Sequence, residues 1–206
     1  MTSKFITFEG IEGSGKTTQI HRLYAYLSDR GLSCIQSKEP GGTIIGSQLR
    51  EMILSTTIPF AHPYSEVMLF YADRLEHCET LIKPALAEGK IVLCDRYLDS
   101  TYAYQVGGRE MPLSLIETLN TLVQLLPDLT ILLDLDVEEG IERVKKRSIL
   151  DRFELEDLSF HYRVREGYLK MAQQYPDRIK MISVKNLSEE AVFDHIKSII
   201  DPFLFP

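Results

Sequence analysis

Short apolar runs alternate along the chain with longer segments in which apolar residues recur every three or four positions. The runs at 91–94 and 130–133 are almost continuously apolar, which is typical of parallel strands covered on both faces. The predicted strands are 4–9, 33–37, 90–94, 129–133 and 179–184, and the predicted helices are about 17–29, 44–55, 64–88, 112–126, 137–147, 157–175 and 188–200. This alternation predicts an α/β fold in three layers, with a five-stranded parallel sheet flanked by helices and ligands at the carboxyl ends of the strands. We expect residues 202–206 to form a tail tucked on the surface.

Composition narrows the class of protein. The 206 residues, of which 44% are hydrophobic and 26% charged, predict one globular domain over 1–206. The net charge of −7 argues against a nucleic-acid partner. Cys34, Cys78 and Cys94 have no C-x-x-C spacing and predict free thiols in a cytoplasmic protein. We expect neither a signal peptide nor a membrane partner, because no apolar run approaches the roughly 20 residues of a membrane span.

The strongest motif lies between the first predicted strand and the first predicted helix. Residues 10–17, Gly-Ile-Glu-Gly-Ser-Gly-Lys-Thr, match the phosphate-binding pattern G-x-x-x-x-G-K-[ST]. Its glycines allow backbone N–H groups to surround phosphate oxygens, and the following helix directs its positive end at the same anion. Lys16 can reach the β- and γ-phosphates, and the Thr17 hydroxyl can bind Mg²⁺. The predicted ATP-binding residues are Gly10, Ile11, Glu12, Gly13, Ser14, Gly15, Lys16, Thr17 and Thr18.

A carboxylate follows the predicted strand 90–94. Asp95 at this position is typical of the second metal-binding motif of phosphate-loop proteins, so Thr17 and Asp95 are the predicted Mg²⁺ ligands. Arg96 can supply positive charge to a phosphate. A solvated Asp-Arg pair at a strand end is the alternative.

Three further segments allow both a functional and a purely structural interpretation. Phe70 and Arg74 share one face of a predicted helix, where they could stack on and hydrogen-bond a base, or simply pack in the core. Residues 100–109 are polar and aromatic, and they could read a base edge or form an amphipathic helix. The basic stretch 143–152 could cover a phosphate-transfer site or end a solvated helix.

Five segments together resemble the bacterial form of the thymidylate kinase family. They are 8–18 (FEGIEGSGKTT), 38–43 (KEPGGT), 70–74 (FYADR), 95–105 (DRYLDSTYAYQ) and 150–154 (LDRFE), in the family's order over about residues 4–175. The resemblance implies a phosphate-loop kinase fold, a lid at about 146–156 and transfer of phosphate from ATP to dTMP. It also implies a homodimer that packs through helices such as 64–88.

The resemblance also implies roles for individual residues. The dTMP-binding residues would be Glu12, Arg50, Phe70, Arg74, Arg96, Ser100, Thr101, Tyr104 and Gln105, and the catalytic residues Lys16, Arg96, Arg147 and Arg152. Glu12 would lie near the sugar 3′-hydroxyl, with Tyr104 under the sugar. Arg50 and Arg96 would hold the phosphate of dTMP. Phe70 would stack on thymine, Arg74 would donate to its O4, and Thr101 and Gln105 would meet its edge. The loop has no Arg at positions 11–14, so the catalytic arginine would come from the lid.

One departure from the family concerns position 38, where this chain has Lys in place of the usual Arg. Lysine keeps the charge but loses the forked donors of arginine, so we expect the loop 39–42 to be held differently from the family's usual arrangement. The alternatives to a dTMP kinase are another nucleoside or nucleoside-monophosphate kinase of the same fold and a non-catalytic nucleotide-binding module. A GTP-dependent switch protein would need an Asn-Lys-x-Asp motif, which this sequence lacks.

Overall fold

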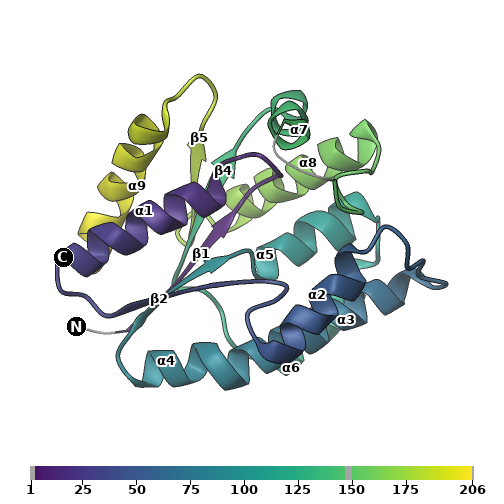
Figure 1. Cartoon of the computed structure of the whole chain (residues 1–206), viewed down its shortest axis with the longest axis horizontal. Helices are drawn as coiled ribbons and strands as arrows, with labels where there is room; N and C mark the ends of the chain where they lie inside the picture. Colours follow the sequence, from purple (N-terminus) through teal and green to yellow (C-terminus); the bar gives the residue numbers. More distant parts are fainter. Residues whose placement is uncertain (1–2, 147–149, 206) are drawn as a thin grey trace.

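The centre of the fold is β1 (Lys4–Glu9), the middle strand of a five-stranded parallel sheet with the order β2-β3-β1-β4-β5 (Figure 1). Its neighbours are β3 (Ile91–Asp95) and β4 (Leu129–Asp134), and the outer strands are β2 (Cys34–Lys38) and β5 (Ile179–Ser183). The computed structural model describes residues 3–146 and 150–205. All five predicted strands are confirmed, with boundaries that shift by no more than one residue.

Helices connect the strands and cover both faces of the sheet, so the predicted three-layer α/β arrangement is also confirmed (Figure 1). They are α1 (Lys16–Asp29), α2 (Ile44–Leu54), α3 (Pro63–His77), α4 (Lys83–Ala87), α5 (Leu98–Thr101), α6 (Leu113–Val123), α7 (Val137–Lys145), α8 (Leu158–Gln174) and α9 (Glu189–Leu204). Two π-helical segments, η1 (Cys78–Ile82) and η2 (Tyr102–Gly108), continue α3 and α5. The predicted helix 64–88 is therefore one helical segment with a wider turn in its middle.

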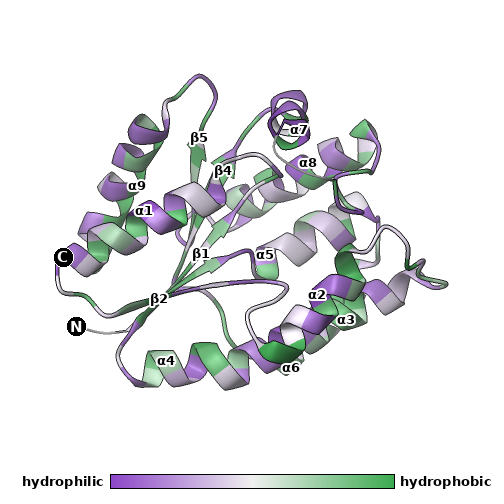
Figure 2. Ribbon diagram, in the orientation of Figure 1, coloured by the Kyte–Doolittle hydropathy of each residue, from purple (hydrophilic) through white to green (hydrophobic). Residues whose placement is uncertain are grey.

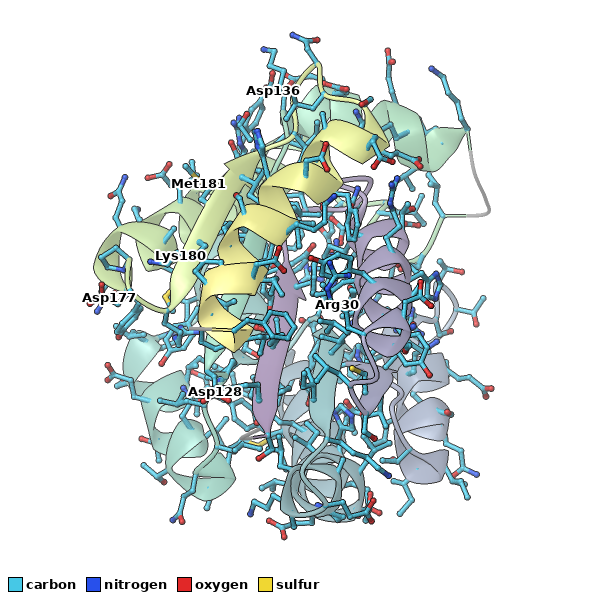
Figure 3. The ribbon with its side chains drawn as sticks, turned by 90° about the vertical axis from the view of Figure 1, so that its left-hand side faces the viewer. Arg30, Asp128, Asp136, Asp177, Lys180 and Met181 are labelled. Atoms are coloured by element: carbon cyan, nitrogen blue, oxygen red, sulfur yellow. The ribbon has the colours of Figure 1, made fainter. Side chains whose placement is uncertain are left out.

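The two faces of β1 contribute to two hydrophobic clusters because successive side chains of a strand point to opposite faces. Phe5 packs in a cluster with side chains of α3, η1 and α6. Ile6 and Phe8 belong to the other cluster, which includes side chains of α1, α8 and α9. Figure 2 shows largely apolar strands in the middle of the fold and helices on which polar and apolar residues alternate. Figure 3, turned by 90°, shows α9 nearest the viewer and α1 beside β1, with Met181 on the edge strand β5.

The C-terminal segment differs from the prediction of a surface tail. Helix α9 continues through Pro202 to Leu204. Phe203 and Leu204 pack against the cluster that contains Ile6 and Phe8, and this burial favours the helical path over a free tail. Within the described residues, no helix is both long enough and apolar enough to cross a bilayer.

Candidate active site at the carboxyl ends of the strands

The loop 10–15 joins the carboxyl end of β1 to α1 through backbone conformations that require glycine. Gly10, Gly13 and Gly15 have φ values of 138°, 74° and 94°, which L side chains rarely adopt. A Cβ on Gly10 would lie 2.3 Å from the carbonyl oxygen of Leu133, and one on Gly13 would lie 2.5 Å from that of Gly140. The loop therefore packs directly against the backbone of β4, which neighbours β1, and against α7.

Polar groups of the same loop are arranged as an anion site. The Nζ of Lys16 folds back to donate to the carbonyl oxygens of Gly10 and Ile11, each at 3.0 Å. Burial and the nearby Arg96 guanidinium lower the pKa of Lys16 to about 8. The Ser14 hydroxyl is buried and has no hydrogen-bond partner among the described residues. A buried hydroxyl without a partner and a buried ammonium held only by carbonyls both fit a phosphate ligand.

Thr17 and Asp95, the predicted metal ligands, are hydrogen-bonded to each other. Asp95 pairs with Phe8 in the β1–β3 register, which places its carboxylate beside the first turn of α1. The Thr17 hydroxyl donates to Asp95 Oδ2 at 2.8 Å. Over residues 3–146 and 150–205, no group of three or more His, Cys, Asp or Glu side chains could hold a metal ion by itself. One hydroxyl and one carboxylate suit Mg²⁺, which keeps waters and substrate phosphates among its ligands.

Next to the loop is a cavity of about 690 Å³. Helices α2 and α3, the turn after β3 and the segment 151–154 contribute to its walls. All predicted base-, sugar- and phosphate-binding side chains line it, namely Glu12, Arg50, Phe70, Arg74, Arg96, Ser100, Thr101, Tyr104 and Gln105. Lys38 also lines it, from the end of β2.

Arg96 organises the part of the cavity nearest the phosphate loop. Its φ of 69° turns the chain sharply after β3, and its guanidinium lies 3.0 Å from Glu12 Oε1 and 2.8 Å from the Tyr168 hydroxyl. The Tyr104 hydroxyl donates to the same oxygen of Glu12. Burial alone would raise the pKa of Glu12, but the charges of Arg96 and Lys16 lower it below its ordinary value. The result is an ionised carboxylate that faces the cavity.

Beneath this turn lies Glu9, a functional-site residue that the sequence analysis missed. Its carboxylate accepts from the backbone N–H of Tyr97 at 2.8 Å, the Ser100 hydroxyl at 2.6 Å and the Tyr168 hydroxyl at 2.8 Å. Burial and the neighbouring Asp99 raise the pKa of Glu9 to about 7. In the sequence, the one feature that could have indicated this role is that Glu9 is a single acidic residue at the end of an apolar strand.

A second buried carboxylate, Glu39, also escaped the sequence analysis. It accepts from Arg74 Nε at 2.8 Å and lies 2.9 Å from Nδ1 of His77, whose Nε2 is 2.6 Å from the Ser37 hydroxyl. A carboxylate can only accept, so Nδ1 carries the proton in that bond. Arg74 is thereby fixed deep in the wall of the cavity, not solvated at its edge.

The loop 39–42 is held by side chains other than Lys38. Asp73 accepts from the N–H of Gly41 at 3.0 Å, and Arg50 donates to the carbonyl of Pro40 at 2.8 Å. Among the residues that the structure describes, the Lys38 ammonium forms no hydrogen bond or ion pair. With Lys at position 38 in place of the family's usual Arg, the loop is held by Arg50 of α2 and Asp73 of α3.

Of the two arginines predicted to act from the lid, Arg152 is not at the phosphate loop in this structure. Arg152 lies outside the lining of the cavity, where its Nη1 is 2.9 Å from Glu66 Oε2 and its Nε donates to the carbonyl of Ile53 at 3.0 Å. Arg147 lies outside the described residues. Arg143 donates to the carbonyl of Gly13 at 3.2 Å. A part for Arg152 in phosphate transfer would require it to leave Glu66.

The phosphate loop also lines a smaller cavity of about 320 Å³. Its lining includes Gly13, Ser14 and Gly15 of the loop, Arg143 of α7 and residues that follow β5. The loop therefore contributes to the walls of two cavities of different size.

Comparisons with known proteins agree over nearly the whole chain. The family model described as thymidylate kinase matches residues 8–196. A thymidylate kinase of Carboxydothermus hydrogenoformans is 43% identical over 203 residues, which cover 98% of each chain. A thymidylate kinase of Trichlorobacter lovleyi is 47% identical over 186 residues, which cover 86% of this chain and 88% of the relative. The crystal structure of thymidylate kinase from Ehrlichia chaffeensis superposes with a TM-score of 0.80 at 36% identity, covering 98% of this chain and all of that one.

Proposed function

The chain belongs to the thymidylate kinase family, and from this membership we propose how its residues divide the transfer of a phosphoryl group from ATP to dTMP. The enzyme converts dTMP and ATP into dTDP and ADP, a step of nucleotide biosynthesis. One observation supports the roles that we propose for individual residues in binding ATP and dTMP. A single cavity is lined both by Lys16 and Thr17 of the phosphate loop and by Arg74 and Gln105, which suit the edge of a base.

The loop 10–18 holds the phosphates of ATP. The unpartnered Ser14 hydroxyl and the Lys16 ammonium, now bound only to two carbonyls, turn to the phosphate oxygens. Thr17 and Asp95 would hold Mg²⁺, which when bound neutralises charge on the phosphates. The smaller cavity beside Gly13 and Arg143 takes the adenosine part of ATP, because the phosphate loop lines it whereas none of the residues proposed to contact dTMP does.

The larger cavity takes dTMP with its phosphate toward the loop. Arg50 and Arg96 bind that phosphate, and Glu12 with Tyr104 contacts the sugar. The base stacks on Phe70 and meets Arg74 at its O4, and the residues at its remaining edge are Thr101 and Gln105.

The chemistry requires alignment and charge neutralisation, with no strong general base. The acceptor is a phosphate that is already ionised at neutral pH, so its oxygen can attack without loss of a proton. Lys16 and Arg96 supply fixed positive charge on either side of the transferred group. The segment 146–156 acts as a lid that adds Arg147 and Arg152 and excludes water, and closure releases Arg152 from Glu66.

Two broader assignments complete the proposal. The enzyme is a homodimer, supported by apolar side chains that stand exposed on the neighbouring helices α2, α3 and α6: Ile44, Met52, Met68 and Leu122. It works in the cytoplasm, supported by three cysteines that are all free thiols.

The test is ADP release from ATP and Mg²⁺ with dTMP, dUMP, UMP, CMP, AMP and thymidine offered separately. We expect turnover that strongly favours dTMP, and light scattering should give the mass of a dimer. Preference for another acceptor would keep the kinase fold but contradict the roles of Phe70, Arg74, Tyr104 and Gln105. Failure of every acceptor in protein that still binds ATP would favour a binding module.

A further inference from the structure

Glu66 on α3 lies just outside the base-binding part of the cavity and touches one of its lining residues. Glu66 is buried, with 3% of its surface exposed, and Gln105 on η2 is 1% exposed. The amide Nε2 of Gln105 donates to Glu66 Oε1 at 3.0 Å. Gln105 is therefore held from behind by a residue that does not itself line the cavity.

The chemistry of Glu66 decides which end of the Gln105 amide faces a ligand. Two guanidinium groups pair with the same carboxylate, with Arg152 Nη1 at 2.9 Å and Arg109 Nη2 at 3.3 Å from Oε2. An ionised carboxylate can only accept hydrogen bonds, so the NH₂ group of Gln105 must point toward it. The carbonyl Oε1 is then the end of the amide left for the cavity, and it can only accept.

Arg74 can only donate hydrogen bonds to a ligand, whereas the carbonyl of Gln105 can only accept them. Three of its N–H groups are used, by Glu39, by the Thr101 hydroxyl at 3.0 Å and by the Tyr97 carbonyl at 3.1 Å. Guanidinium has five N–H groups and no acceptor, so whatever Arg74 offers the cavity is a donor. The wall thus offers a donor from Arg74 and an acceptor from Gln105.

We infer that Glu66 is a specificity-determining positioning residue, which selects pyrimidines with a carbonyl at C4 and a proton on N3 by fixing the orientation of Gln105. This rests on the proposed contact of Arg74 and Gln105 with the base. Thymine and uracil match the pattern, because O4 accepts and N3–H donates. Cytosine reverses both positions, since its 4-amino group donates and its N3 accepts. A buried polar site rejects an analogue that leaves its groups unpaired far more strongly than an apolar pocket rejects a misfit.

The test compares dTMP with 5-methyl-dCMP, which differ only at positions 3 and 4 of the base. We would measure kcat/KM for both with wild type and Glu66→Gln. In Glu66→Gln the new amide can either donate or accept, so Gln105 is free to turn. We expect the preference for dTMP to fall by about tenfold or more. Some preference should remain, because the N–H donors of Arg74 still face the 4-amino group of cytosine, which also donates. The KM for ATP should stay within about twofold.

A matched control removes a different carboxylate from the same cluster. Glu156 Oε1 lies 2.5 Å from Arg109 Nη1, and no hydrogen bond joins it to Gln105 in the described parts of the chain. Glu156→Gln should leave the preference for dTMP over 5-methyl-dCMP as in wild type. An equal loss of preference in Glu156→Gln would mean that charge near Arg109, and not the orientation of Gln105, sets the selectivity, which overturns the inference.

A double variant keeps the test decisive if Glu66→Gln folds poorly. Glu66→Gln with Gln105→Glu exchanges the two side chains, preserves the charge of the cluster and leaves an acceptor at position 105. The exchange should restore the wild-type preference, and a folded double variant without preference would overturn the inference.

Gln105→Ala separates failure of the inference from failure of the proposed function. A raised KM for dTMP in Gln105→Ala, with an unchanged preference in folded Glu66→Gln, would overturn the role of Glu66 alone. An unchanged KM for dTMP in Gln105→Ala would contradict the base contact itself, and the inference with it.

Discussion

Replacing Glu9 with glutamine should change how the stability of this enzyme depends on pH. Burial and Asp99 raise the pKa of Glu9 from 4.5 to about 7 in the folded protein. A carboxyl whose pKa is higher in the folded than in the unfolded state contributes most stability at low pH. That contribution is lost as the pH rises through the folded-state pKa.

The magnitude follows from the size of the shift. One pKa unit corresponds to about 1.4 kcal/mol, so ionising Glu9 should cost about 3 kcal/mol of unfolding free energy between about pH 4.5 and pH 7. Glutamine can keep the geometry, because its carbonyl can accept from the N–H of Tyr97 and its amide can donate to the hydroxyls of Ser100 and Tyr168. Glutamine does not titrate.

Urea unfolding of wild type and Glu9→Gln, at half-unit steps from pH 5 to pH 8, would measure the effect. The difference in unfolding free energy, variant minus wild type, should increase in favour of the variant by about 2 to 3 kcal/mol over this range. Other titrating groups are common to both proteins and cancel in the difference. A difference that stays constant with pH, or moves in favour of wild type, would refute the assignment of a raised pKa to Glu9.

Three further substitutions test other parts of the site. Lys16→Ala should lower kcat by roughly a hundredfold or more with an unchanged circular dichroism spectrum, and near-normal turnover would exclude its proposed role. Gly13→Ala should lower the Tm and weaken ATP binding more than Gly31→Ala, since both have φ near 75° but only Gly13 has backbone within 4 Å of the added Cβ. In His77→Asn the amide nitrogen takes the place of Nδ1 and can still donate to Glu39, whereas in His77→Gln it takes the place of Nε2 and cannot. His77→Gln should therefore raise the KM for dTMP more than His77→Asn does, and neither variant should change the KM for ATP. Equal effects of the two His77 variants would argue against positioning through Glu39.

The sheet and the phosphate loop could be predicted because their signals are local. The apolar runs of β3 and β4 are continuous, and the pattern from Gly10 to Thr17 carries its own spacing. Asp95 could be placed because parallel strands end at one edge of the sheet. The π-helical turns could not be predicted, because a π-turn leaves the apolar periodicity of the surrounding helix nearly unchanged.

The buried carboxylates could not be predicted for a different reason. Glu9, Glu39 and Glu66 each accept hydrogen bonds from residues distant in sequence, so no short pattern identifies them. Arg152 shows the same limit, because its neighbours in sequence suggest a free lid cation whereas its partner Glu66 lies on α3. Sequence patterns thus predict where the site lies, and tertiary contacts determine how its polar groups are directed.

The central position of β1 has a consequence for synthesis of the protein. The strand leaves the ribosome first, yet it pairs with residues 91–95 and 129–132, which are made much later. The phosphate loop that follows it packs against the backbone carbonyls of Leu133 and Gly140. Non-local pairing of this kind forms slowly, because the intervening chain must be ordered first. A nascent chain that ends before β4 therefore contains the whole phosphate-binding motif without the supports that shape it. We therefore expect a chain to bind ATP only when it extends through α7, which completes the packing around the phosphate loop.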